Sequence, residues 1–336
     1  MFDSFIHIIR GSLLMKKHLY GTGLSFTLAA VLLAGCGSGD SDAPEENTGS
    51  DENDNGTEEA TGYVPEELRV QFVPSQNADT LEAKAKPLED LLTAELDIPV
   101  TVSVSTDYNT IVEAMASEQV DVGFLPPTAY VLAEERGAAE VILQAQRYGV
   151  NDEDGSPTED LVDFYKSQII VKKDSGIESI EDLKGKKMGY QSVTSSAGYV
   201  WPAAVLIDAG LDPLTDVEPV TLKGHDQAII SLLNGDVDAA ATFQDARNVV
   251  TSDYPSVFED TEILEFTEPI PNDTIAVLPD MDQEWKDKIQ AAFIAIGESE
   301  DGRAIIKDVY THEGYVKSDD SKFETVREYN EKVKTE

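Results

Sequence analysis

The chain has 336 residues, a length that allows two ordinary domains, each with a sizeable core. Its 65 acidic residues far outnumber its 25 basic residues, which gives a formal net charge of -40. Such a chain repels polyphosphate backbones, so the charge excludes a nucleic-acid-binding protein. A single cysteine and four histidines exclude a disulfide framework and cysteine-rich metal sites, and we expect no metal and no cofactor.

Residues 1–36 have the features of a bacterial export signal. Two lysines precede an apolar stretch that is too short for a comfortable membrane span and that ends in Leu-Ala-Gly-Cys at Cys36. This ending resembles a lipobox, which implies cleavage before Cys36 and a lipid on its sulfur. The alternative is an ordinary secretory signal with an unrelated cysteine. Because the basic start lies beside Met15, we expect translation to begin there rather than at Met1.

An acidic segment follows the signal. Residues 37–62 carry nine Asp or Glu residues and no Lys or Arg, and the rest of the segment is small or polar. This composition buries no core, and the charges repel one another. We therefore expect residues 37–65 to be a disordered tether that joins a lipid anchor to a folded part on the extracytoplasmic face of the cell membrane.

From residue 68 onward, strand and helix patterns alternate. The expected strands cover 68–74, 100–104, 120–125, 141–145, 168–172, 187–190, 219–222, 237–243 and 274–278. The expected helices cover 81–96, 108–117, 128–135, 179–183 and 199–209, with one ending at 233, one from 245 and three amphipathic helices from 284. Such alternation predicts an α/β fold with mostly parallel sheets flanked by helices. Ligands of such sheets bind at the carboxyl ends of strands, beside helix N-termini.

Strands and helices alternate in the second half of the chain as they do in the first, but no fixed repeat length recurs in the sequence. This pattern indicates two similar lobes rather than a repeat array. We expect residues 66–167 to form the first part of lobe 1 and residues 168–268 to form lobe 2. Residues 269–336, with the C-terminal helices, would complete lobe 1. The chain would then cross between the lobes twice.

Four polar segments lie where an expected strand gives way to an expected helix. They are Ser105-Thr106-Asp107-Tyr108, Pro127-Thr128-Ala129-Tyr130, Ser192-Val193-Thr194-Ser195-Ser196 and Gly224-His225-Asp226. Helix N-termini expose unpaired N–H groups, and several of them together with hydroxyl donors make an anion site. Simple helix capping is the alternative for each segment. It accounts poorly for Thr194, Ser195 and Ser196, because a cap needs only one hydroxyl.

Several blocks of the chain, between residues 68 and 308, resemble the phosphate/phosphite/phosphonate substrate-binding proteins of ABC transporters. They are Leu68-Arg69-Val70 to Val73-Pro74-Ser75, Thr106-Asp107-Tyr108, Val120-Asp121-Val122-Gly123-Phe124-Leu125 with Pro127 and Tyr130, Lys173-Asp174-Ser175-Gly176-Ile177, Asp182-Leu183-Lys184-Gly185-Lys186, Gly224-His225-Asp226 and Pro271-Asn272-Asp273. The resemblance implies a two-lobed fold like that of type II periplasmic binding proteins. Its lobes would close on a phosphorus oxyanion in the cleft between them.

The resemblance also implies site residues. The family's tyrosines carry over to Tyr108 and Tyr130, which would wall the pocket and donate O–H groups, and its His-Asp pair carries over to His225 and Asp226. The family's hydroxyl-rich loop often reads Ser-Thr-Ser-Gly-Tyr. Here the same frame reads Ser195-Ser196-Ala197-Gly198-Tyr199, so the third hydroxyl is missing, while Thr194 offers one earlier in the chain.

Two further residues complete the expected site. Thr128 belongs with the tyrosines that face the hydroxyl cluster from the other lobe. Asp245 follows an expected strand, at a carboxyl end. Its carboxylate would accept a hydrogen bond from a monoprotonated oxyanion or would meet a substrate amine, and a helix-capping role is equally open.

The sequence therefore predicts a monomeric substrate-binding protein that delivers a phosphorus oxyanion to an ABC permease. Another oxyanion or small solute, such as a sulfonate, nitrate or vitamin precursor, is the first alternative, because hydroxyl-lined helix termini suit any oxyanion. An enzyme that uses His225 and Asp226 is a remote alternative. Adjacent residues cannot make the usual contact between a base and its orienting group, and the sequence has no nucleophile elbow, Walker loop or metal-ligand spacing.

Overall fold

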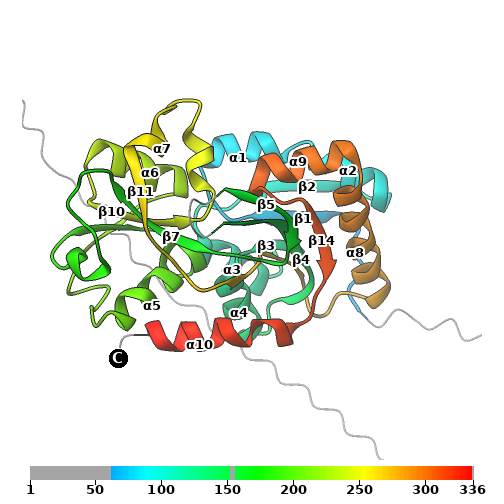
Figure 1. The fold of residues 1–336 in the computed structure, drawn as a ribbon. Coiled ribbons are helices and arrows are strands. Elements are labelled where there is room, and N and C mark those ends of the chain that lie inside the picture. Colours follow the sequence, from blue (N-terminus) through cyan, green and yellow to red (C-terminus); the bar gives the residue numbers. More distant parts are fainter. Residues whose placement is uncertain (1–61, 152–155, 335–336) are drawn as a thin grey trace, which may run out of the picture. The chain divides into compact units, whose positions relative to one another are not determined.

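The computed structural model describes residues 62–151 and 156–334 (Figure 1). The expected signal sequence, Cys36 and nearly all of the expected tether lie outside these residues. Within the described ranges, no helix combines the length and the apolar character that crossing a membrane requires.

One sheet has seven strands. They are β1 (Leu68–Phe72), β2 (Val100–Val104), β3 (Val122–Leu125), β4 (Glu140–Val150), β5 (Pro157–Val162), β13 (Thr274–Val277) and β14 (Gly314–Lys317). The order across the sheet is β14-β4-β13-β3-β1-β2, and β5 pairs with β4. The helices of this part of the chain are α1 (Ala78–Ala85), α2 (Leu88–Leu96), α3 (Tyr108–Ala116), α4 (Pro127–Glu135), α8 (Gln283–Glu298) and α9 (Glu300–Tyr310).

A second sheet has five strands. They are β7 (Ser167–Lys172), β8 (Lys187–Tyr190), β9 (Glu218–Thr221), β10 (Ala239–Phe243) and β11 (Thr261–Phe266), in the order β11-β7-β10-β8-β9. Its helical elements are η1 (Ile180–Leu183), η2 (Ser196–Val200), α5 (Trp201–Asp208), α6 (His225–Asn234), η3 (Ala246–Val250) and α7 (Val257–Asp260). The α/β class and the three C-terminal helices are confirmed, with α10 (Glu324–Val333) as the last.

The sheets are mixed, so the expectation of mostly parallel pairing is corrected. β1 pairs in parallel with β2 and β3, and β8 pairs in parallel with β9 and β10. β13, however, lies between β3 and β4 and is antiparallel to both, and β7 is antiparallel to β10 and β11. β7 is the first strand of the five-stranded sheet that the chain forms after leaving the seven-stranded sheet, and β13 is the first strand that it forms on returning. Each of these two strands is antiparallel to both of its neighbours.

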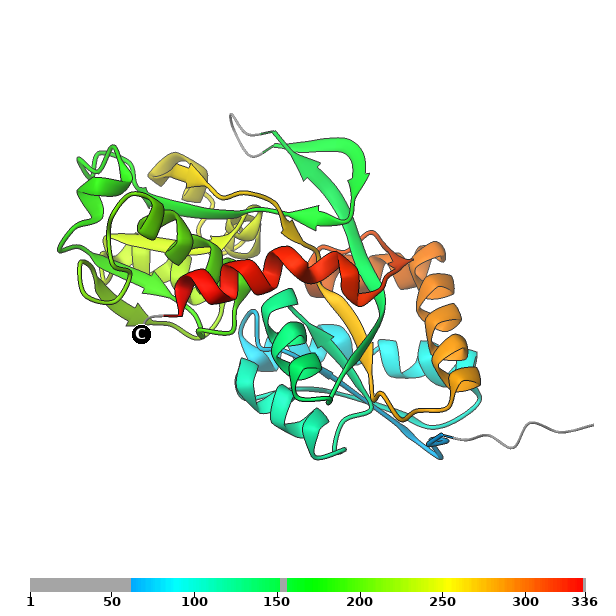
Figure 2. The same ribbon diagram turned by 90° about the horizontal axis from the view of Figure 1, so that it is seen from below.

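Two crossing segments join the sheets. The first crossing segment contains the short strand β6 (Phe164–Tyr165), and the second contains the short strand β12 (Ile270–Pro271). These two strands pair antiparallel with each other. Helix α10, the red helix of Figure 2, packs against both α4 and α5. The ring of Trp201 stacks on that of Tyr329 of α10, with ring centroids 4.3 Å apart. The domain boundaries at 167/168 and 268/269 fall beside these crossings, and we keep them as a proposal.

Several local elements differ from the sequence prediction; β11 and β14, for example, were not expected. The helix expected over 81–96 is two helices, α1 and α2, because Pro87 lacks the N–H that a continuous helix would need there. The strand expected over 141–145 extends to Val150, and its last residues pair with the antiparallel strand β5, which was not expected. Arg147 lies in this extension and is buried.

Candidate functional site

The starts of four helical segments meet at one cavity of about 40 Å³. Tyr108 begins α3, Pro126 precedes α4, Ser195 precedes η2 and His225 begins α6. The polar side chains that line the cavity are Ser75, Gln76, Tyr108, Arg147, Tyr165, Ser195, His225, Asp273 and Tyr310. The volume of about 40 Å³ is the space that the centre of a water-sized sphere can occupy. A single water molecule needs about 10–15 Å³ on this measure, so the cavity suits a compact ligand.

Both sheets contribute to the cavity. Ser195 and His225 belong to the second sheet's part of the chain, whereas Tyr108, Arg147 and Asp273 belong to the first sheet's part. The two parts touch at the cavity wall, where the His225 backbone N–H donates to the Ser75 carbonyl over 2.8 Å. A ligand at this place therefore contacts residues from both sheets at once.

The hydroxyl cluster divides into three roles. Ser195 lines the cavity, and its Oγ accepts a hydrogen bond from the Gly198 N–H at 3.1 Å. Ser196 instead donates to Thr128 Oγ1 at 2.9 Å and accepts from the Thr128 N–H at 3.0 Å. Thr194 pairs with the Ser192 hydroxyl at 2.9 Å. Of the three expected hydroxyls only Ser195 reaches the cavity, since Ser196 joins the two parts of the chain through Thr128.

The two expected tyrosines lie in different places. Tyr108 lines the cavity, and burial raises the pKa of its hydroxyl, which the nearby carboxylates of Asp273 and Asp226 raise further. Tyr130 does not line it, because its hydroxyl donates to Asp320 at 2.9 Å and its ring packs on Phe323. The expected pocket position of Tyr130 is therefore corrected. The C-terminal segment covers α4 on the side where Tyr130 points.

His225 and Asp226 also separate. The His225 ring lines the cavity, its Nδ1 lies 3.0 Å from Thr242 Oγ1, and burial lowers its pKa to about 3, so it is neutral at physiological pH. Asp226 is buried in the first turn of α6 but does not line the cavity. Gly224 has a φ of +92°, and a Cβ there would lie 2.5 Å from Asp226 Oδ1, so this turn requires glycine.

Sequence reasoning missed the charged residues of the cavity. Arg147 is 4% exposed and lines the cavity, although the expected anion site contained no cation. Its Nη1 lies 3.6 Å from Asp245 Oδ1, and its Nη2 lies 4.0 Å from Asp273 Oδ2. Asp273 lines the cavity, whereas Asp245 does not. Asp273 lay within the quoted Pro-Asn-Asp block, which is the one signal that pointed to it.

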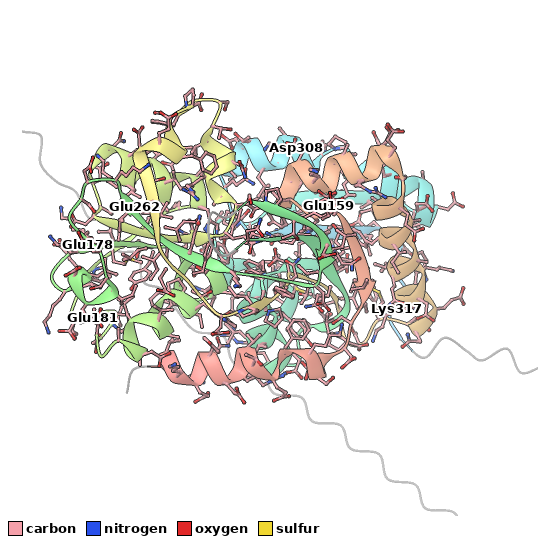
Figure 3. The ribbon with its side chains drawn as sticks, viewed as in Figure 1. Glu159, Glu178, Glu181, Glu262, Asp308 and Lys317 are labelled. Carbon is pink, nitrogen blue, oxygen red and sulfur yellow. The ribbon has the colours of Figure 1, made fainter. Side chains whose placement is uncertain are left out.

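The acidity of the chain lies largely on its outside. Figure 3 labels Glu159, Glu178, Glu181 and Glu262 among the side chains, and all four residues are exposed. At physiological ionic strength, interactions between exposed charges are largely screened beyond about 8 Å, whereas buried donors act at contact distance. The net charge therefore does not prevent a small anion from occupying the cavity.

The arrangement is that of a binding site. Buried Tyr108, Tyr165 and Tyr310 have raised pKa values, because burial disfavours their charged forms, so they stay protonated hydroxyls at physiological pH. His225 contacts Thr242 rather than a carboxylate through Nδ1, which leaves it without the orienting partner of a catalytic base. Among the described residues, no three His, Cys, Asp or Glu side chains gather to hold a metal ion.

Comparison with solved structures shows the fold. The binding-protein component of an ABC phosphonate transporter from Pseudomonas aeruginosa superposes with a TM-score of 0.69 at 19% identity, over 78% of this chain and 85% of that one. A Prochlorococcus marinus protein solved with methylphosphonate gives a TM-score of 0.68 at 18% identity, over 80% and 99%. The two-lobed fold of type II periplasmic binding proteins is thereby confirmed.

Comparison of sequences shows the family. The phosphate-import protein PhnD of Mycolicibacterium smegmatis is 31% identical over 63% of this chain, and the match spans 62% of that protein, a little under two thirds of its length. The phosphonates-binding periplasmic protein of Escherichia coli is 22% identical over 71% of this chain and 69% of its own. Residues 70–323 match the family described as ABC transporter, phosphonate, periplasmic substrate-binding protein. The chain belongs to this family of phosphonate substrate-binding proteins of ABC transporters.

Proposed function

We propose that this protein captures a small phosphorus oxyanion outside the cytoplasm and delivers it to an ABC permease. The ligand would occupy the cavity between the two sheets, bound by Tyr108, Ser195, His225 and Arg147. A lipid on Cys36 would hold the protein, as a monomer, at the extracytoplasmic face of the cell membrane. Membership of the family supports the transport role, and the cavity supports the choice of ligand.

The donors of the cavity suit an oxyanion. The Ser195 Oγ accepts a hydrogen bond from Gly198, so its own proton can be donated either to the neighbouring Tyr108 hydroxyl or to a ligand. When the Thr242 hydroxyl donates to Nδ1 of the neutral His225 ring, Nε2 carries the proton and becomes a second donor. The Tyr108 hydroxyl and the Arg147 guanidinium add further donors from the first sheet's side.

The Asp273 carboxylate is the observation that favours a phosphorus oxyanion. It lines a cavity whose other polar groups are mostly donors, and it offers only acceptor oxygens when ionised. A phosphate, phosphite or phosphonate keeps one P–OH group over part of the physiological pH range, and that group donates to a carboxylate. A sulfonate, sulfate or nitrate has no such proton, and its oxygens would face the carboxylate without a hydrogen bond between them.

Isothermal titration calorimetry of residues 62–336 tests this function. We expect phosphite, methylphosphonate or phosphate to bind at least tenfold more tightly than sulfate, because only these ligands donate to Asp273. The names of the relatives point to the same ligand class, since one imports phosphate and another was solved with methylphosphonate. Equal or tighter binding of sulfate, or binding of none of the phosphorus oxyanions, would contradict the proposed function.

The lipid anchor is tested in the full-length chain expressed in a bacterium that processes lipoproteins. Wild-type protein should sediment with membranes, and Cys36→Ser should appear in the soluble extracytoplasmic fraction, because Cys36 is the single cysteine of the chain. Ser38→Ala, two residues further on, is the control and should fractionate as wild type does. Membrane association of Cys36→Ser at the wild-type level would show that the attachment has another cause.

A further inference from the structure

Arg147 is a buried cation whose donors are largely unused. Its Nε and Nη1 have no hydrogen-bond partner within the described parts of the chain, and its Nη2 reaches the Tyr310 carbonyl only at 3.5 Å. Its guanidinium lies over the Tyr165 ring at 4.8 Å. Arg69 shows what a satisfied arginine looks like in this protein, since its side chain donates twice to Asp121 at 2.7 and 2.8 Å.

Such a position is costly without an acceptor. Buried guanidinium groups are ordinarily paired and hydrogen-bonded, because each unsatisfied charged donor loses its hydration without replacement. The nearest carboxylate oxygens, at 3.6 and 4.0 Å, lie beyond hydrogen-bonding distance. Since Arg147 lines the cavity, an oxyanion bound there is positioned to supply the missing acceptors.

The same guanidinium lies close to two carboxylates, of which only Asp273 lines the cavity. Asp245 follows β10 and Asp273 precedes β13, and each faces a different nitrogen of Arg147. The buried histidines beside them, His225 and His312, do not supply a balancing charge, because burial lowers the pKa of each. Without Arg147, two carboxylates would border the cavity with no cation between them, and such an arrangement attracts an ammonium group.

We propose that Arg147 determines the ligand class by filling the position at which an amine-bearing ligand would place its ammonium group. The unused nitrogens of Arg147 then bind the oxyanion, while Asp245 and Asp273 hold its charge in place. The site thus selects compact phosphorus oxyanions without an amine, such as phosphite, phosphate or methylphosphonate, over aminoalkylphosphonates. This inference rests on the proposed function and deepens it.

The test compares methylphosphonate with 2-aminoethylphosphonate by calorimetry on three proteins. Wild type should prefer methylphosphonate. Arg147→Gln should bind methylphosphonate about 10- to 100-fold more weakly, through loss of charged hydrogen bonds, and should prefer 2-aminoethylphosphonate, because the freed carboxylates and the space of the guanidinium accept its ammonium group. Arg247→Gln is the matched control: Arg247 is 5% exposed and stacks on Phe258, but it does not line the cavity, so both affinities should stay unchanged.

A second variant protects the test against misfolding. Arg147→Lys keeps a positive charge between the carboxylates but loses the planar fork, so methylphosphonate binding should weaken without any gain for 2-aminoethylphosphonate. If Arg147→Gln or Arg147→Lys binds methylphosphonate as tightly as wild type does, the inference is overturned and the proposed function stays intact. The inference is also overturned if the wild-type protein prefers 2-aminoethylphosphonate to methylphosphonate. Failure of wild type to bind any phosphorus oxyanion overturns the proposed function and the inference with it.

Discussion

Asp273→Asn is expected to lower the preference for phosphite over sulfate about 10- to 100-fold. The carboxylate of Asp273 lines the cavity and accepts a hydrogen bond from a ligand that carries a proton. The amide of asparagine has nearly the same shape but also donates, so it suits the unprotonated oxygens of sulfate. A hydrogen bond to a charged group contributes about 1.5–3 kcal/mol, which is the source of the expected range.

The ratio of the two affinities is the quantity to measure, by calorimetric titration of the same protein with each anion. Loss of the Asp273 charge also changes the field at Arg147, 4.0 Å away. Because sulfate is a dianion and monoprotonated phosphite a monoanion, this change favours sulfate and lowers the ratio further. Asp163→Asn is the matched control, because the Asp163 side chain pairs with Lys322 and does not line the cavity, while its carbonyl accepts from the Asn272 N–H next to Asp273. An unchanged ratio in Asp273→Asn would show that the Asp273 carboxylate does not select phosphite over sulfate.

The parts of the site that could be predicted are those that local rules govern. Tyr108, Ser195 and His225 stand at the starts of helical elements, and the sequence marks such positions with hydroxyls, glycine and turn residues. Strand ends and helix starts of an α/β fold gather on one side, so these residues were expected to meet. The break of the helix at Pro87 follows from an equally local rule, because proline lacks the N–H that a helix interior needs.

Arg147 could not be predicted because its burial depends on partners far away in the chain. An arginine near the end of a strand ordinarily lies in solvent, with its charge hydrated. Here the groups that surround the guanidinium include Asp245, Asp273 and the Tyr310 carbonyl, all of which come from much later in the sequence. Tyr130 was misplaced for the same reason, since Asp320 and Phe323 cover it from the C-terminal segment. No local pattern specifies which later segment will pack on an earlier one.

Phe124→Ala is expected to lower the free energy of unfolding of the ligand-free protein by about 3–5 kcal/mol, the usual cost of removing a buried aromatic side chain. Phe124 is 1% exposed and lies in β3, stacked on Phe72 with ring centroids 4.1 Å apart. The rings of Phe293, Tyr310 and Tyr315 meet it edge-on at 5.4, 6.4 and 6.3 Å. Because these rings come from strands and helices throughout the first sheet's part of the chain, the cavity left by the substitution cannot close without moving several elements.

Urea unfolding followed by circular dichroism measures this loss, with Phe258→Ala as the control. Phe258 is 45% exposed, and its ring contacts the Arg247 guanidinium at 4.6 Å, so its removal should cost no more than about 1 kcal/mol. Tyr310 both packs on Phe124 and lines the cavity, where its hydroxyl donates to the Val73 carbonyl over 2.6 Å. Phe124→Ala should therefore also weaken ligand binding, since a loosened Tyr310 no longer fixes the cavity wall, whereas Phe258→Ala should leave affinity unchanged. Equal stability losses in the two variants would mean that the aromatic cluster does not hold the first sheet together.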